Sequence, residues 1–243
     1  MSPAIATVVG GAVAAGSAAG ALFYATYGVR SQWLGSTDWR GRTDTQAIAL
    51  TFDDGPGDDT EGVLDALAER AITATFFVVG RSVERRPALA RRIVSDGHEI
   101  GNHSYSHPIY LYRSPGETYR QLARTQAIVA DATGVTPALS RQPCGVRTPA
   151  YFRACRELGL RTIQWTVAGF DWRPWPCERI ASTVLAGCAP GAIVLLHDGD
   201  GFGTSRRQAT VAAIGPIADG AAKRELGIVP LRRLLDRGIS THA

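Results

Sequence analysis

Apolar runs of strand length alternate with amphipathic, helix-like stretches from residue 47 to near the C-terminus. The seven runs span residues 47–52, 73–79, 98–102, 138–142, 161–167, 192–196 and 227–230. Short apolar runs that alternate with helical patterns are typical of parallel strands joined by crossover helices. The pattern therefore predicts an α/β fold, a distorted (β/α)7-type barrel built as a single domain.

Two of the intervening stretches have clear helical periodicity. Residues 61–71 place four apolar side chains on one helical face, namely Val63, Leu64, Leu67 and Ala71. Ser114 and Glu117 form the pattern of a capping box. A long helix is therefore expected to begin at residue 114 and to end near residue 133.

The start of the chain differs, because residues 4–29 contain no charged side chain and Arg30 ends the run. A helix needs about 20 apolar residues to cross a bilayer, so this run is long enough. We assign residues 1–34 to an apolar N-terminal helix that anchors the protein to a membrane, 35–44 to a linker and 45–243 to the folded domain. The Ala and Gly content leaves a soluble helix open as an alternative. The lack of Lys or Arg before the run disfavours a cleavable signal.

Composition and charge argue against several classes of protein. With 45% hydrophobic and 20% charged residues, the chain is expected to be globular rather than disordered. The net charge of +4 is not concentrated in a basic block, so a nucleic-acid partner is not expected. The four cysteines, Cys144, Cys155, Cys177 and Cys188, lack CxxC spacing. A disulfide between Cys177 and Cys188 and buried free thiols are both open.

Two adjacent carboxylates follow the first predicted strand, in the sequence Asp53-Asp54-Gly55-Pro56. In a β/α barrel the reactive groups lie at the C-terminal ends of the strands, which is where these residues fall. The same four residues are also good turn formers, so a purely structural interpretation stays open for this motif taken alone.

Four histidines lie next to predicted strands, and their expected roles differ. His103 and His107 follow the strand 98–102, and residues four apart meet on one face of a helical turn. Two imidazoles with one carboxylate make a ligand set for zinc or a similar ion, although structural histidines in the core are the alternative. His98 begins its strand and is expected to be structural. His197 ends the run 192–196 and could serve as a general acid or lie satisfied in a turn.

Five motifs then occur in a characteristic order: TFDDGP at 51–56, HSYSH at 103–107, RQPCG at 141–145, DW at 171–172 and LLH at 195–197. In this order they resemble the polysaccharide deacetylases, also called the NodB-homology domain or carbohydrate esterase family 4. The resemblance covers the chain from about residue 45 to the C-terminus.

The resemblance implies a metal site and an acid–base pair. Asp54, His103 and His107 are expected to bind one divalent ion, by default zinc, with cobalt and manganese also open. Asp53 is expected to take a proton from the attacking water, and His197 to protonate the departing amine.

The resemblance also assigns supporting roles. Arg141 is expected to orient the Asp53 carboxylate, and Asp171 to set the charge of His197. Trp172 and Leu195 would line the pocket for the acetyl methyl group, although both residues would also suit a core. The backbone N–H of Cys144 would donate to the oxyanion. The family usually has an aromatic residue at that position, so the change is expected to alter substrate choice.

Together these expectations describe a metal-dependent hydrolase of linear amides that removes N-acetyl groups from a peptidoglycan- or chitin-like polymer or oligomer. Substrate choice would depend on loops such as 108–113 and 199–207. The expected location is the cell envelope, with membrane association through residues 4–29 and the catalytic domain outside the cytoplasm. Arg30, Arg40 and Arg42 all follow the apolar run, however, and favour the opposite orientation. The oligomeric state leaves no sequence signal.

Three alternatives differ in chemistry. The same fold could act as a deformylase or deacetylase of a lipid-linked aminosugar, which a membrane anchor would suit. It could also be a non-catalytic carbohydrate-binding module, but every expected catalytic residue is present. A Ser or Cys hydrolase is disfavoured, because no GxSxG elbow occurs and Cys144 has no recognised His partner in sequence.

Overall fold

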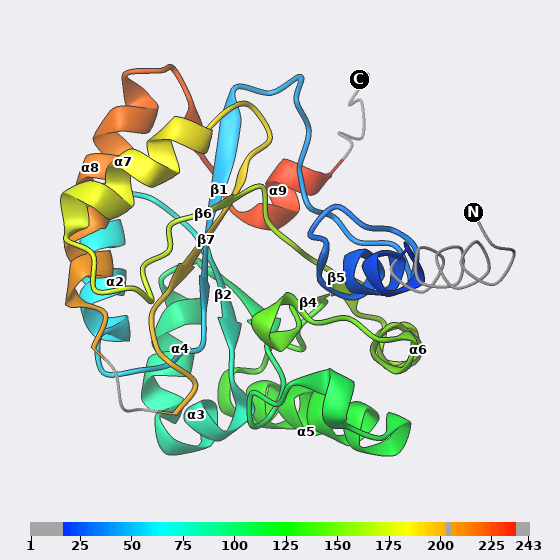
Figure 1. The fold of residues 1–243 in the computed structure, drawn as a ribbon. Helices are drawn as coiled ribbons and strands as arrows, with labels where there is room; N and C mark the ends of the chain where they lie inside the picture. The colour runs from blue at the N-terminus through cyan, green and yellow to red at the C-terminus, as the bar shows by residue number, and fades with distance from the viewer. Residues whose placement is uncertain (1–16, 203–205, 237–243) are drawn as a thin grey trace, which may run out of the picture.

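The computed structural model describes residues 17–202 and 206–236. Its centre is a parallel sheet in the order β5-β4-β3-β2-β1-β7-β6, and β8 pairs with the start of β1. The strands are β1 (Ala47–Asp53), β2 (Thr75–Val78), β3 (Glu99–Asn102), β4 (Leu139–Ser140), β5 (Arg161–Thr162), β6 (Val167–Ala168), β7 (Ile193–His197) and β8 (Gly227–Ile228). The predicted α/β class is confirmed, and the sheet curls into a partial barrel with helices around it (Figure 1).

The predicted strand 161–167 is wrong as one continuous strand. Its first residues form β5 at one edge of the sheet and its last residues form β6 at the other edge. The backbone N–H of Ile163 still bonds to Ser140 beside β4, whereas that of Thr166 already bonds to Ile193 in β7. The few residues that join β5 to β6 can span at most roughly 20 Å. The two edges of the sheet must therefore lie close together. This apolar run therefore brings the barrel toward closure.

Helices fill the connections between strands. They are α2 (Thr60–Ala68), α3 (Gly80–Arg85), α4 (Pro87–Ser95), α5 (Pro115–Thr133), α6 (Pro149–Glu157), α7 (Cys177–Gly187), α8 (Gln208–Ala222) and α9 (Leu231–Leu235), with 3-10 turns at Tyr110–Tyr112 and Pro143–Gly145. Ser114 caps α5 as predicted, because its side chain accepts a hydrogen bond from the Glu117 N–H at 3.2 Å. Helix α2 ends earlier than expected, and Ala71 has a left-handed φ of 50°.

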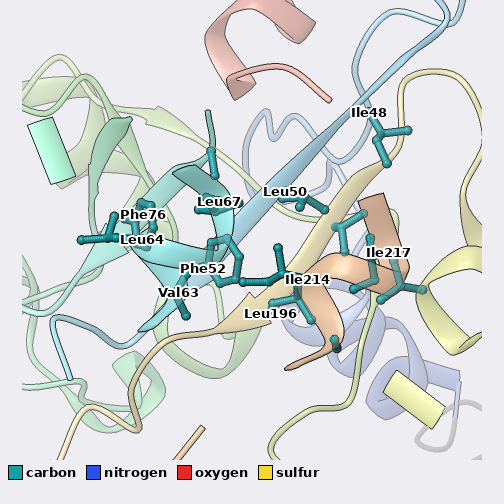
Figure 2. Packing of buried hydrophobic residues seen from close by; sticks show 14 of the residues in the cluster. Ile48, Leu50, Phe52, Val63, Leu64, Leu67, Phe76, Leu196, Ile214 and Ile217 are labelled. Atoms are coloured by element: carbon teal, nitrogen blue, oxygen red, sulfur yellow. The ribbon is translucent and has the colours of Figure 1, made fainter. Parts of the chain in front are cut away.

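The main core lies between one face of the sheet and helices α2, α3, α4, α5, α7 and α8. Leu50, Phe52 and Leu196 project from neighbouring strands, and Leu64 and Ile214 meet them from the helices (Figure 2). These side chains are completely buried. Because helices cover the sheet, its strands read as nearly continuous apolar runs, which is why sequence alone located them. The core thus fixes in place the strands whose ends carry the polar side chains.

The segment before β1 also contacts the domain. The residues expected to form a linker, 35–44, include Asp38, which bridges to Ile163, and Gly41, whose N–H bonds to Gly191. Residues 17–27 are helical, and buried Arg147 donates to the backbone carbonyls of Gly28 and Ser31 just after them. Arg147 therefore ties the end of this helix to the domain.

The predicted membrane anchor at 4–29 lies partly outside the described residues, since 4–16 are not among them. Within the part that is described, no helix combines the length and apolarity needed to cross a bilayer. The four cysteines are free thiols, so of the two alternatives left open by the sequence, the Cys177–Cys188 disulfide is not formed.

Candidate active site

Three predicted metal ligands meet at the C-terminal end of the sheet. Asp54 Oδ1 lies 3.3 Å from His103 Nε2 and 3.0 Å from His107 Nε2. The three ligand atoms all lie within 4.8 Å of one another. The stretch that carries the two histidines is a bend, not the predicted helical turn, and His107 has a left-handed φ of 56°. The residue spacing therefore predicted two histidines that do lie together, although the local structure that it predicted for them is wrong.

The hydrogen bonding of this cluster fits a bound cation. His103 Nδ1 lies 2.7 Å from the Arg141 carbonyl oxygen, which can only accept, so we place the ring proton on Nδ1. The Nε2 lone pair then faces Asp54. Asp54 Oδ1 is buried and has no hydrogen-bond partner among the described residues. A lone pair and a carboxylate oxygen that face each other in a buried site favour a metal ion between them.

The electrostatics of Asp54 agree with this assignment. Burial alone would raise the pKa of Asp54, but the neighbouring imidazoles of His103 and His107 and the charge of His197 hold it well below its usual range. The carboxylate is therefore ionised and available as a ligand at neutral pH.

Asp53 is held by a buried arginine. Arg141 Nη1 donates to Asp53 Oδ1 at 2.7 Å and to Thr51 Oγ1 at 2.8 Å, and its Nη2 donates to the Gln164 carbonyl at 3.0 Å. Arg141 is completely buried. Asp53 Oδ2 lies on the side of the metal ligands, 3.8 Å from His103 Nε2. The arginine thus orients one oxygen and leaves the other facing the site, as predicted.

His197 lies opposite Asp53 on the neighbouring strand. The two residues are register partners of β1 and β7, and neighbouring strands lie about 4.8 Å apart. His197 Nδ1 is 2.8 Å from Asp171 Oδ1, and Thr210 holds the other oxygen of Asp171. Burial would lower the pKa of His197, but the charge and hydrogen bond of Asp171 raise it to about 9. His197 is therefore protonated at neutral pH, with its Nε2–H free of the Asp171 bond.

The proposed metal ligands line a pocket of about 400 Å³ together with Asp53 and His197, and the lining also includes Trp172, Leu195 and Cys144. The Trp172 ring is 45% exposed and lies edge-on to the His197 ring at 5.3 Å. Cys144 has a left-handed φ of 56° in the pocket wall. Burial and the charge of Asp54 raise the pKa of the Cys144 thiol, which disfavours a thiolate nucleophile. His98 lies outside this pocket lining and accepts a hydrogen bond from the Ala74 N–H at 3.1 Å, the structural role expected of it.

Sequence analysis missed a carboxylate that links two loops of the site. Asp198 accepts hydrogen bonds from the Gly55 N–H at 3.2 Å and the Thr60 hydroxyl at 2.6 Å. A Cβ at Gly55 would lie 1.9 Å from Asp198 Oδ2, and one at Gly199 would lie 2.8 Å from the Asp54 carbonyl oxygen. The turn that carries Asp54 and the strand end that carries His197 are thus interlocked. An acid directly after His197 at a strand end was the available signal.

Sequence analysis also missed Arg207, which lines the pocket. Only its loop, 199–207, was singled out, as part of a substrate groove. A lone arginine in a loop carries no motif, so its place in the pocket lining could not be predicted without the fold.

Comparison with known proteins gives consistent matches. The profile of the family described as polysaccharide deacetylase matches residues 40–163. The peptidoglycan-N-acetylglucosamine deacetylase PgdA of Listeria monocytogenes is 44% identical over 152 residues, which are 62% of this chain and 32% of PgdA. The chain thus spans about a third of the length of that relative.

A second relative matches over most of its own length. The chitooligosaccharide deacetylase of Bradyrhizobium sp. is 38% identical over 199 residues, covering 78% of this chain and 91% of the relative. Among solved structures, the Bc1960 peptidoglycan N-acetylglucosamine deacetylase superposes with a TM-score of 0.78 at 30% identity, covering 82% of this chain and 92% of the other.

Proposed function

The chain belongs to the polysaccharide deacetylase family, and from this premise we propose that it is a metal-dependent hydrolase that removes N-acetyl groups from an acetylated aminosugar polymer or oligomer. One observation carries the proposal: the Asp54, His103 and His107 ligand atoms converge beside Asp53 and His197. The pocket thus combines a cation site with a base and an acid, which amide hydrolysis requires.

A cation at Asp54, His103 and His107 would polarise the acetyl carbonyl and lower the pKa of water beside it, and zinc, cobalt or manganese would suit this ligand set. The remaining chemistry comes from the chain itself. Asp53 takes a proton from the attacking water through Oδ2, while Arg141 holds Oδ1. The Cys144 N–H donates to the oxyanion that forms on the former carbonyl oxygen.

Collapse of the tetrahedral adduct breaks the C–N bond, and the departing nitrogen needs a proton because an amide anion is a poor leaving group. His197 supplies that proton from Nε2, since the hydrogen bond that its Nδ1–H donates to Asp171 keeps the ring protonated and correctly oriented. Trp172 and Leu195 enclose the acetyl methyl group. Acetate and a free amine on the sugar are the products.

The names of the relatives support a glycan that contains N-acetylglucosamine. One relative is described as acting on peptidoglycan N-acetylglucosamine and the other on chitooligosaccharides. We extend this substrate class to the chain, together with a location in the cell envelope. The uncharged residues 4–29 support membrane association within that location.

The test is acetate release from N-acetylglucosamine oligomers, peptidoglycan and acetylated xylan, measured before chelation, after chelation and after metal is added back. We expect acetate that disappears with the chelator and returns with metal, from at least one N-acetylated glycan. The His98→Asn variant is a matched control, because His98 lies outside the pocket and asparagine can still accept the Ala74 hydrogen bond. Release that is indifferent to the chelator would overturn the proposal. No release from any glycan by a metal-loaded chain would favour a lipid-linked substrate or a binding role.

A further inference from the structure

The helix at residues 17–27 leaves its aromatic side chains outside the domain. Phe23, Tyr24 and Tyr27 are 65%, 43% and 39% exposed. Ala25, which lies on the opposite side of the helix, is only 5% exposed. A helix that completes a core buries its large apolar side chains, so this helix has the reverse arrangement. Its contact with the domain alone does not explain why the exposed residues are aromatic.

Trp33 extends this exposed surface beyond the end of the helix. The Trp33 ring is 66% exposed and lies edge-on to the Tyr24 ring, with 5.5 Å between the centroids. The Phe23 and Tyr27 rings stack on each other at 5.0 Å. We call this surface the aromatic face, and its members are Phe23, Tyr24, Tyr27 and Trp33. A cluster of apolar groups that stays exposed to water marks a surface that binds an apolar partner.

The aromatic face is fixed to the catalytic domain by a buried arginine. The Arg147 side chain donates to the carbonyl oxygens of Gly28 and Ser31, the latter at 2.9 Å. The Arg147 backbone N–H donates to the Thr26 carbonyl at 3.2 Å. Arg147 follows Gly145 by two residues, and Gly145 lines the pocket. A partner that binds the aromatic face therefore also sets the orientation of the pocket.

The sequence before the helix indicates which partner covers the aromatic face. Residues 4–16 lie outside the described ranges, but in the sequence they lead directly into the helix, and residues 4–29 contain no charged side chain. The aromatic face thus lies at the end of an uncharged run. Trp and Tyr are favoured at the boundary of a bilayer, where the ring is in an apolar layer and its polar atom reaches water. Arg30, which is exposed and follows the run, can meet lipid phosphates.

We propose that the aromatic face binds at the boundary between the headgroups and the acyl chains of a phospholipid bilayer. This inference rests on the membrane association proposed above and assigns the lipid contact to residues of the folded domain. It does not depend on the deacetylase activity. Because Arg147 joins the helix to the segment beside the pocket, lipid contact at the aromatic face holds the pocket in one orientation to the bilayer.

The experiment adds vesicles of phosphatidylcholine and phosphatidylglycerol to the full chain and records its tryptophan emission. Half of the samples contain lipid with brominated acyl chains, because bromine quenches only indole rings that lie in or beside the bilayer. Wild-type emission should fall with the brominated lipid. In Trp33→Phe the quenched fraction should be smaller by roughly threefold or more, since the ring at the boundary is no longer an indole. Trp172→Phe is the matched control, because Trp172 is also exposed but lies in the pocket.

A second variant tests whether the whole aromatic face takes part. The double variant Phe23→Asp and Tyr27→Asp should lose the quenching of Trp33, because two charges at the boundary disfavour contact with acyl chains. Tyr112→Asp should keep it, since Tyr112 is 74% exposed but lies in the loop after β3.

An absence of quenching in the wild type, or equal quenching in the wild type and Trp33→Phe, would overturn the inference. So would a dimer in the absence of lipid that the Phe23→Asp and Tyr27→Asp variant dissociates in analytical ultracentrifugation, because the aromatic face would then be covered by a second copy. The quenching measurement contains no glycan. A failure of the proposed deacetylase function would therefore leave this result unchanged, and a failure of lipid contact would leave acetate release from soluble glycans unchanged.

Discussion

Two of the proposed metal ligands adopt backbone conformations that side-chain-bearing residues rarely take. Asp54 has a φ of 79° and His107 a φ of 56°. Such conformations cost about 1–3 kcal/mol each and persist where the surrounding structure enforces them, often at functional sites. Here both turns direct a ligand atom toward the same point. The strained backbone at these two residues therefore helps to bring their ligand atoms together.

Removal of one ligand tests this convergence. His107→Ala is expected to bind far less than one metal ion per chain and to lose acetate release, because only two ligands remain. Metal content measured by elemental analysis after dialysis checks the first effect. The His98→Asn protein should keep its metal under the same dialysis. Stoichiometric metal in His107→Ala would show that the ligand set is wrong.

The His197–Asp171 pair predicts how stability depends on pH. The pKa of His197 is raised to about 9, against a usual value of 6.5, chiefly because Asp171 outweighs burial. A raised folded-state pKa gives stabilisation that is complete below the unfolded value and is lost as pH rises through about 9.

In the chelated protein, the free energy of unfolding of the wild type relative to Asp171→Asn should therefore decline between about pH 6 and pH 10, by on the order of 3 kcal/mol. Urea titrations of both proteins across this range measure the difference. Parallel stability curves for the two proteins would contradict the assigned charge state of His197.

The site residues differed in how well they could be predicted from the sequence. His103 and His107 were singled out by their spacing and the Asp53-Asp54 pair by its position after a strand, but the choice of Asp54 as a ligand depended on the resemblance. Arg141 and Asp171 depended on the resemblance, because 88 residues separate Arg141 from Asp53 and 26 separate Asp171 from His197. Asp198 was missed because its partners, Gly55 and Thr60, are distant in the sequence, and Arg207 was missed because its bond to the nearby Gly199 carbonyl belongs to no motif.

At the scale of elements, the loops after β1 and β7 act as one unit. Asp198 joins them through Gly55 and Thr60, and a Cβ at Gly55 would overlap the Asp198 carboxylate at 1.9 Å. A side chain at Gly55 must therefore displace the turn that presents Asp54.

Gly55→Ala is accordingly expected to weaken cobalt binding, followed by its visible absorption, by about tenfold or more, and to lower Tm by several degrees. Gly62→Ala is the control, because Gly62 lies inside α2 and its Cβ would meet Val211 at an ordinary 3.4 Å. Unaltered cobalt affinity in Gly55→Ala would show that the interlock does not position the metal ligand.

Elements with strong local signals were predictable, and those shaped by closure of the sheet were not. Helix α5 (Pro115–Thr133) has its N-cap at Ser114 and its end at Thr133 as expected, because capping is a local effect. The run 161–167 divides into β5 and β6 because tertiary pairing with opposite edges overrides its continuous apolar pattern. Likewise, residues 103–107 bend rather than form a helical turn, with Ser104 at a left-handed φ of 70°.

At the scale of the whole molecule, the parallel sheet explains why the site is complete. The ends of β1, β3 and β7 lie at one end of the sheet, so Asp53, His103 and His197 converge although the sequence separates them widely. The curl that brings β5 near β6 also lets Arg141, just after β4, reach across to Asp53. The fold class was predictable from alternation, but this curvature depends on contacts between distant segments.

The central claim is that Asp53 activates water beside a cation that it does not itself bind. The most direct measurement is acetate release and metal content on the same samples of the wild type and Asp53→Asn, whose amide oxygen can still accept from Arg141. We predict about one metal ion per chain in both proteins and a rate in the variant that is lower by about 10³-fold. Acetate release by Asp53→Asn at the wild-type rate would contradict the account.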